Sequence, residues 1–218
     1  FELRQCYQLY CTHRQMIDEC DKEIEKQLIV QIASKNEGVI PDIPKVKRKV
    51  CGKHKVKFNL TADLKEILKV DVTEVFGINE LSALTILSEV GCDMTKWKTE
   101  HHFTSWLGLA PNTKISGGKV MSSRIMKKKH HAGQAFRMAA NGLYNSKSPL
   151  GEYFRRLRAK AGAPKAVVAT ARKLAIIYYK MVANKEAFNS KALEDYRKKY
   201  NEKKINQLKR KIAQLEAA

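Results

Sequence analysis

Apolar residues recur along the first 33 residues at spacings near three, four and seven, and this predicts one long amphipathic helix. Acidic and basic residues occupy its remaining faces. The apolar positions are Leu3, Tyr7, Tyr10, Ile17, Ile24 and Leu28. Such a helix serves either as a coiled coil between subunits or domains, or as a helix packed on its own domain. The pattern leaves both interpretations open.

The helical pattern stops after this segment, because Pro41 and Pro44 cannot continue a helix. The stretch from Lys45 to Lys57 then holds seven basic residues in thirteen, with valines between them. We expect a basic linker or an edge strand here, one that becomes ordered on nucleic acid if it binds any.

Five cysteines are scattered through the chain, and no two of them have the spacing of a zinc knuckle. Cys51 and His54 could offer two metal ligands, but nothing nearby supplies the other two. We therefore expect no metal site, and reduced thiols in a cytoplasmic protein.

A second helical region begins at Thr61, a candidate cap, and the run from Val75 to Gly91 follows it. This run resembles a helix-hairpin-helix element, in which a glycine-rich turn brings backbone N–H groups to a phosphate. Asn79 stands where the second glycine of such a turn usually lies, and Gly91 should end the helix. The alternative is a capped core helix, and a single glycine favours packing over phosphate contact.

The rest of the chain predicts further helices and one hairpin. A short helix over residues 99–109 should end at Gly108, since Pro111 prevents its extension. Residues 112–126 carry β-branched and apolar side chains around Gly117-Gly118, which indicates a hairpin or a tight loop. Helices are predicted at about 131–146, 150–161, 164–184 and 190–216.

These elements predict a mainly α protein in four parts. Residues 1–34 are a coiled-coil-like helix and residues 35–60 a basic linker. Residues 61–188 are a compact helical domain with the helix-hairpin-helix-like element and the short β-hairpin or loop. Residues 189–218 are a C-terminal helical tail. No apolar run reaches the ~18 residues that a membrane span needs, so we expect no membrane partner.

The charge distribution points to a polyanion as partner. Residues 101–185 carry 17 Lys/Arg and a single acid, Glu152, in a chain of net charge +20. A field of one sign repels itself unless a polyanion neutralises it, and DNA and RNA are the commonest polyanions in a cell. A hydrophobic content of 44% is enough for a packed core, so the chain is not a disordered polycation. A basic binding protein and an enzyme acting on nucleic acid both fit.

A serine followed by two glycines lies within this basic block, as Ser116-Gly117-Gly118-Lys119. A serine hydroxyl needs activation to attack a phosphodiester, and fixed Lys and Arg side chains stabilise the charge that develops. These residue types fit a covalent phosphoserine intermediate. They also fit an ordinary turn that contacts phosphate without chemistry, which the residues alone favour. Ser122 and Ser123 are alternative nucleophiles, and no general base is evident except His130 and His131, whose reach the sequence does not give.

The candidate nucleic-acid contacts are the glycines of this loop and the cations around and after it. They are Lys114, Gly117, Gly118, Lys119, Arg124, Lys127, Lys128, Lys129, Arg137, Arg155, Arg156, Lys165 and Arg172.

Four segments together resemble the C-terminal domain of the insertion sequence 110/116/902 transposase family. They occur in the family's order over about residues 61–185, which makes the resemblance more specific than any single motif. They are Gly77–Thr85 (GINELSALT), Phe103–Pro111 (FTSWLGLAP), Ser116–Lys119 (SGGK) and Pro164–Leu174 (PKAVVATARKL). The helix of residues 1–33 resembles the coiled-coil segment that precedes this domain.

The resemblance implies site-specific DNA recombination by an RNA-guided, two-part enzyme. Ser116 matches the serine that attacks DNA covalently. A separate nuclease-like domain would hold Mg²⁺ on four carboxylates, and a structured guide RNA would pair with the DNA. The resemblance also implies a homo-oligomer that works in the prokaryotic cytoplasm, associated with the nucleoid.

The carboxylate domain is expected before residue 1. Phe1 is neither a methionine start nor part of a signal peptide, so we expect a fragment or a processed product that cannot recombine DNA alone. Two alternatives remain. One is a non-catalytic basic nucleic-acid-binding module, and the other is a coiled-coil scaffold whose charge serves solubility.

Overall fold

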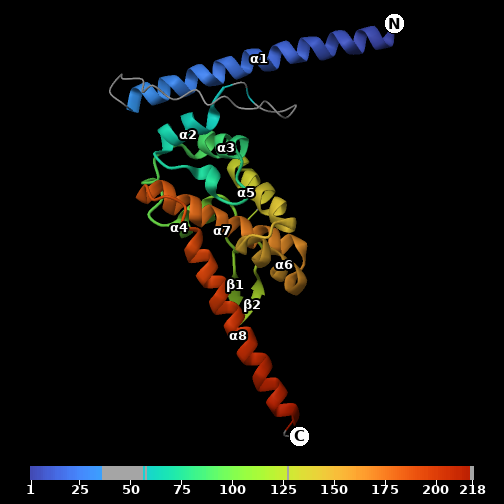
Figure 1. The fold of residues 1–218 in the computed structure, drawn as a ribbon, viewed down its shortest axis with the longest axis vertical. Helices are drawn as coiled ribbons and strands as arrows, with labels where there is room; N and C mark the ends of the chain where they lie inside the picture. The colour runs from blue at the N-terminus through green and yellow to red at the C-terminus, as the bar shows by residue number, and fades with distance from the viewer. Residues whose placement is uncertain (36–55, 57, 127, 217–218) are drawn as a thin grey trace. The chain divides into compact units, whose positions relative to one another are not determined.

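The computed structural model describes residues 1–35, 56, 58–126 and 128–216. Contacts within the chain divide it into two compact units, Phe1–Asp71 and Val72–Ala218. Figure 1 shows that both are built from helices, and one two-stranded hairpin is the only sheet in the described part of the chain. The prediction of a mainly α fold is confirmed. Most of the predicted basic linker, with Cys51, His54 and also Lys127, lies outside the described residues.

The first unit contains α1 (Glu2–Lys35) and α2 (Leu60–Leu68). The end of α1 packs against α2, where the Lys35 ammonium donates a hydrogen bond to the Ile67 carbonyl at 2.8 Å. Leu28 and Ile32 are buried, whereas the apolar positions toward the N-terminus of α1 are more than half exposed. The long helix is thus confirmed, and its first two-thirds leave an apolar stripe uncovered in the single chain.

The predicted cap of α2 was wrong. The helix begins at Leu60 with Asn59 in the capping position, so Thr61 already lies within the first turn. The Asn59 side chain makes no capping hydrogen bond to the helix.

The second unit is organised around α7 (Ala163–Asn184), which packs against α4 (Glu100–Trp106), α5 (His131–Gly142) and α6 (Pro149–Ala161). Its core is aromatic, because Phe103, Phe136 and Tyr178 meet with ring centroids 5.7 to 6.5 Å apart. Such offset and edge-to-face contacts add to the burial of large apolar side chains. The remaining helical elements are η1 (Val72–Glu74), α3 (Glu80–Val90), η2 (Leu143–Asn145) and α8 (Ser190–Glu216).

Helix ends in this unit follow the local sequence signals. Thr99 caps α4 through the backbone N–H of His102, and Ser148 caps α6 through that of Gly151. Prolines occupy the first turns of α6 and α7, and the glycines at 91 and 162 end α3 and α6. The predicted helices after residue 130 are confirmed to within a few residues.

The turn before α3 serves close packing. Gly77 has φ of +90°, and a Cβ placed there would lie 2.8 Å from the carbonyl oxygen of Ala139 on α5. Asn79 does not take the role of a turn glycine, because its φ is −97°. It is instead the N-cap of α3, where its side-chain oxygen accepts a hydrogen bond from the Ser82 N–H at 2.8 Å.

Strands β1 (Lys114–Ser116) and β2 (Lys119–Ser122) form the predicted hairpin. Gly117 and Gly118 have φ of +56° and +74°, and a two-residue turn with two left-handed residues is of type I′. The arms continue below the strands, where the Asn112 N–H donates to the Arg124 carbonyl and Pro111 bridges to Ile125. The glycine pair therefore lies at the tip of an arm based at Pro111 and Ile125.

Candidate nucleic-acid interface

Ser116 lies beside the turn of the hairpin and is exposed. It pairs in register with Lys119, so their side chains share one face of the ribbon. Lys114 lies two residues earlier on β1, beyond a register shift between Lys114 and Ile115. Both lysines are exposed, and a Cβ built on Gly117 or Gly118 would meet no atom within 4 Å. A phosphate backbone can thus approach the Ser116 hydroxyl without displacing protein.

The other two candidate serines are placed differently. Ser122, at the end of β2, is half-buried, and its hydroxyl accepts a long hydrogen bond of 3.4 Å from the Arg124 N–H. Ser123 is exposed and lines a groove at the base of the hairpin. Of the three, Ser116 alone sits at the glycine turn.

His130 is engaged away from the hairpin. Its Nδ1 lies 2.8 Å from Oε1 of Glu89, and its ring lies 4.2 Å from that of Trp106 between centroids. The second Glu89 oxygen accepts a hydrogen bond from the Ala132 N–H at 2.6 Å, in the first turn of α5. This contact joins α3 to α5, and the sequence did not reveal it because the partners lie over 40 residues apart.

The Glu89 carboxyl has a lowered pKa. Its partial burial alone raises the pKa, but hydrogen bonds from Ala132 and His130 to the charged form outweigh that effect. His130 is therefore part of a structural contact and a poor candidate for the general base that Ser116 needs.

A groove of about 770 Å³ opens at the base of the hairpin, between the loops before and after it and the first half of α7. We call it the basic groove. Leu109, Pro111, Ile125, Val168 and Ile176 form its apolar floor. Arg124, Lys165, Arg172 and Lys173 bring four cations to it. Three of these were candidate contacts from the sequence, and the fold brings them together from two distant segments.

Three other candidate cations are bound to backbone carbonyls inside the second unit. Lys128 donates to the Ser105 carbonyl at 3.3 Å, and Arg137 donates to the Gly108 carbonyl at 3.1 Å. Arg155 donates to the carbonyls of Tyr144 and Ser146 at 2.8 and 2.6 Å. Each of these side chains has a structural role that composition alone could not distinguish from a phosphate contact. Lys129, by contrast, is exposed.

A ladder of cations and tyrosines holds α8 against α6 and α7. The Lys173 ammonium lies 4.1 Å from the ring centroids of both Tyr153 and Tyr196. The guanidinium of Arg156 lies 3.6 Å from the ring of Tyr200 and 5.5 Å from that of Tyr153. These five residues are called the α8 ladder.

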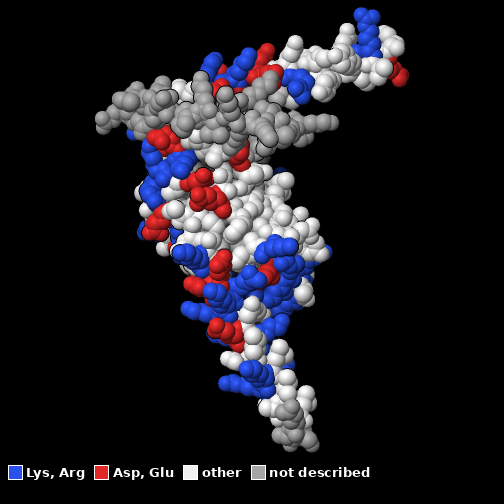
Figure 2. Space-filling model, in the orientation of Figure 1, with Lys and Arg blue, Asp and Glu red and all other residues white. Residues whose placement is uncertain are grey.

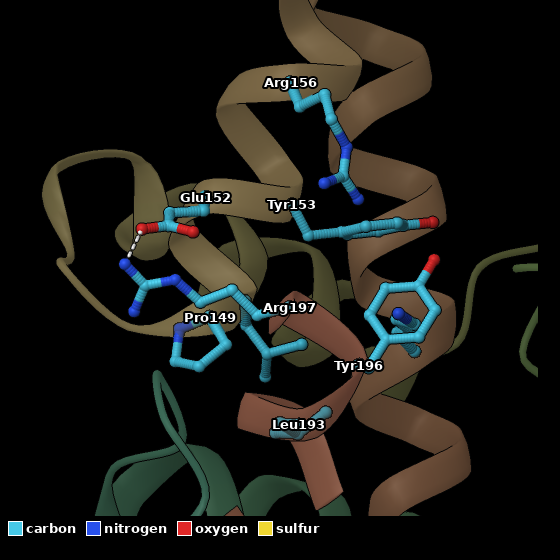
Figure 3. Close-up of a pocket in the computed structure, with 9 residues that line it drawn as sticks. Pro149, Glu152, Tyr153, Arg156, Leu193, Tyr196 and Arg197 are labelled. Atoms are coloured by element: carbon cyan, nitrogen blue, oxygen red, sulfur yellow. Dashed lines mark ion pairs between the residues drawn. The ribbon is translucent and has the colours of Figure 1, made fainter. Parts of the chain in front are cut away.

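Figure 3 shows the place where α8 meets α6, with the ion pair between Glu152 and Arg197, 2.6 Å long, beside Tyr153 and Tyr196. Burial, and secondarily the Arg156 charge, lowers the pKa of Lys173. Lys173 and Tyr153 line both this site and the basic groove, and sequence reasoning missed both. Two tyrosines four residues apart on α8, at 196 and 200, were the available signal.

Positive charge gathers on one part of the second unit. On the face drawn in Figure 2, Lys and Arg gather over the part built from α6, α7 and the start of α8. The described residues include no group of three or more His, Cys, Asp or Glu placed to hold a metal ion. Within the described ranges, no helix has the length and apolar character to cross a membrane.

The comparisons with known proteins address the family. Residues 71–155 match the family model described as "Transposase IS116/IS110/IS902 family". The matched segment contains three of the four sequence segments on which the resemblance rests, including Ser116 and the hairpin. None of the curated proteins and none of the solved structures matches the chain. Residues 71–155 therefore resemble transposases of this family, and the match supports a transposase-related role that involves DNA.

Proposed function

We propose that residues 72–218 are the DNA-binding and strand-joining part of a recombinase, in which the Ser116 hydroxyl attacks a DNA phosphodiester. The observation that carries this proposal is the exposed Ser116 beside a type I′ Gly-Gly turn, paired with the exposed Lys119 and two residues from the exposed Lys114. The turn offers the nucleophile, and the two ammonium groups offer compensation for the charge of the attacked phosphate.

The reaction is a transesterification. A bond forms between Ser116 Oγ and phosphorus, and the bond from phosphorus to one sugar oxygen breaks. The serine proton passes to a base outside the described residues, and the departing sugar oxygen takes up a proton. One phosphate ester replaces another, so the energy of the broken bond is retained and a second sugar hydroxyl can reverse the exchange.

Activation of the nucleophile is the part that these residues do not supply. His130 is held by Glu89 and Trp106, and no described cluster can hold a metal ion. We propose that a separate carboxylate domain with Mg²⁺ completes the site, and that a guide RNA and further copies of the chain complete the assembly. No step above uses these groups.

The test is to trap the covalent intermediate. The chain, joined to its carboxylate domain and guide RNA, is incubated with DNA whose bridging oxygen at the cleavage site is replaced by sulfur, which blocks rejoining. We expect a protein–DNA adduct on a denaturing gel. Trypsin then separates the candidates, because Ser116 falls in the peptide Ile115–Lys119 whereas Ser122 and Ser123 fall in Val120–Arg124.

Matched alanine variants complete this experiment. Ser116→Ala should abolish the adduct, while Ser122→Ala and Ser123→Ala should retain it. An adduct on Val120–Arg124 would instead identify Ser122 or Ser123 as the nucleophile. If Ser116→Ala left every step of recombination unchanged, the second unit would be a non-catalytic nucleic-acid-binding module.

A further inference from the structure

The basic groove is separate from the hairpin tip that carries Ser116. The arm from Pro111 to Ser116 spans five residues, or about 16 Å at ~3.3 Å per residue of strand. On duplex DNA this corresponds to roughly five base steps of 3.4 Å. A nucleotide in the groove therefore flanks the phosphate that Ser116 attacks and is not the one that reacts.

The lining of the groove combines two chemistries. Its floor is aliphatic, from Ile125 on one side and from Val168 and Ile176 of α7 on the other. Arg124 and Lys165 are exposed cations at its edge. Phosphate binding alone would not use an apolar floor, because phosphates and sugars gain little from leaving water for an aliphatic surface. A flat, weakly polar group attached to an anion would therefore complement both parts of the groove.

Arg172 adds a hydrogen-bond donor that is not satisfied within the described structure. One of its terminal nitrogens lies 3.5 Å from Nδ1 of His101, but its Nε is buried without an acceptor among the described residues. Buried donors are rarely left unpaired. Because Arg172 lines the groove, a bound group with an acceptor is a candidate partner for this donor.

We propose that the basic groove binds an unpaired nucleotide, with its base on the aliphatic floor and its phosphates on Arg124, Lys165 and Arg172. The volume of about 770 Å³ lies within the ordinary range of ligand sites and has no room for a duplex. In a duplex the bases stay stacked inside the helix, whereas an unpaired base can leave the stack and cover the floor. The proposal rests on nucleic-acid binding by the second unit, but not on Ser116 chemistry.

The first experiment measures reversible binding of the 218-residue chain to a labelled single-stranded DNA, a single-stranded RNA and a DNA duplex. The salt concentration is raised so that binding through phosphate alone is weakened. Val168→Asn and Ile125→Thr remove apolar floor from opposite sides of the groove. Met138→Gln is the matched control, because it removes a comparable apolar surface from an exposed position on α5 outside the groove.

We expect each floor variant to weaken single-strand binding about tenfold and duplex binding by less than about twofold. The control should bind like the parent. The DNA and RNA arms show which strand supplies the nucleotide. Equal binding by parent and both floor variants would overturn the proposal, as would equal weakening on single strands and duplex.

A second measurement protects the test if a floor variant fails to fold. The parent chain is photo-crosslinked to single strands carrying a thio-substituted pyrimidine and digested with trypsin. Cross-links should fall on the peptide Ala166–Arg172, which carries Val168. Cross-links confined to other peptides would exclude the groove. Because reversible binding and cross-linking are measured without covalent trapping, failure of trapping and failure of the groove are separate results.

Discussion

Oε1 of Glu89 lies 2.8 Å from Nδ1 of His130. The other carboxylate oxygen of Glu89 accepts a hydrogen bond from the Ala132 N–H at the start of α5. Glu89→Ala would leave the His130 ring and the Ala132 N–H without this partner. We expect the free energy of unfolding to fall by about 1.5–3 kcal/mol, the usual cost of removing a partly buried charged hydrogen bond. Urea denaturation measures it, and Glu194→Ala on exposed α8 is the control with little expected change.

The same interaction makes stability depend on pH. The folded-state pKa of Glu89 is lowered, so its contribution is complete above the unfolded-state pKa of about 4.3 and is lost as pH falls through the folded-state value. The difference between the parent and Glu89→Ala should therefore shrink below about pH 4.3. If the difference in free energy of unfolding stayed constant down to strongly acidic pH, packing and not the charged carboxylate would be its cause.

Gly77 and Gly142 predict opposite outcomes for the same substitution. Gly77→Ala places a methyl group 2.8 Å from the Ala139 carbonyl oxygen at a φ of +90°. We therefore expect the free energy of unfolding to fall by about 2–3 kcal/mol. Gly142, the last residue of α5, has open space around it and an ordinary helical φ of −61°. Gly142→Ala should be neutral or stabilising by up to about 1 kcal/mol. Thermal or urea unfolding of the two variants decides the matter, and equal effects would contradict the close approach of the turn to α5.

The turn beside Ser116 can be tested without disturbing the core. Gly118→Val puts a β-branched residue at a φ of +74°, so we expect covalent trapping to slow by about tenfold or more at unchanged unfolding temperature. Gly117→Asn is the matched control, since Asn followed by Gly is the preferred sequence of a type I′ turn. Undiminished trapping by Gly118→Val would show that the turn geometry is immaterial to the reaction.

The two exposed lysines of the hairpin, Lys114 and Lys119, predict a specific salt dependence. Replacing Lys114 and Lys119 by Ala should reduce the slope of log K against log salt by about 0.9 for each phosphate that the protein no longer neutralises. Lys180→Ala is the control, because its ammonium lies 3.6 Å from Glu100 and is already compensated. Binding to duplex DNA over a salt series provides the measurement. A slope unchanged by the double substitution would mean that the hairpin does not touch phosphate.

The helices and the hairpin could be predicted because their signals are local. Apolar periodicity located α1 and the helices after residue 130, and prolines and glycines marked their ends. Thr61 was assigned wrongly as a cap because Asn59 and Thr61, two residues apart, are both residue types that cap helices. Asn79 was assigned to a turn for a similar reason, whereas the extended backbone before α3 makes it a cap.

The interface could be predicted only in part, because its cations are arranged by tertiary structure. Sequence charge alone does not distinguish Arg137, which donates to a backbone carbonyl, from Lys165, which is exposed at the groove. Nor does it show that Lys173 enters the α8 ladder while its neighbour Arg172 has a donor to spare. Each distinction depends on helix phase and on segments that lie far apart in the chain.

The hairpin from Lys114 to Met121 is exposed throughout, with even Ile115 and Val120 uncovered. A hairpin that no other part of the described chain packs against cannot by itself hold the Ser116 hydroxyl in a fixed orientation. Under the proposed mechanism the substrate would therefore supply the alignment, and fidelity would come from how the DNA is bound elsewhere rather than from the shape of the hairpin.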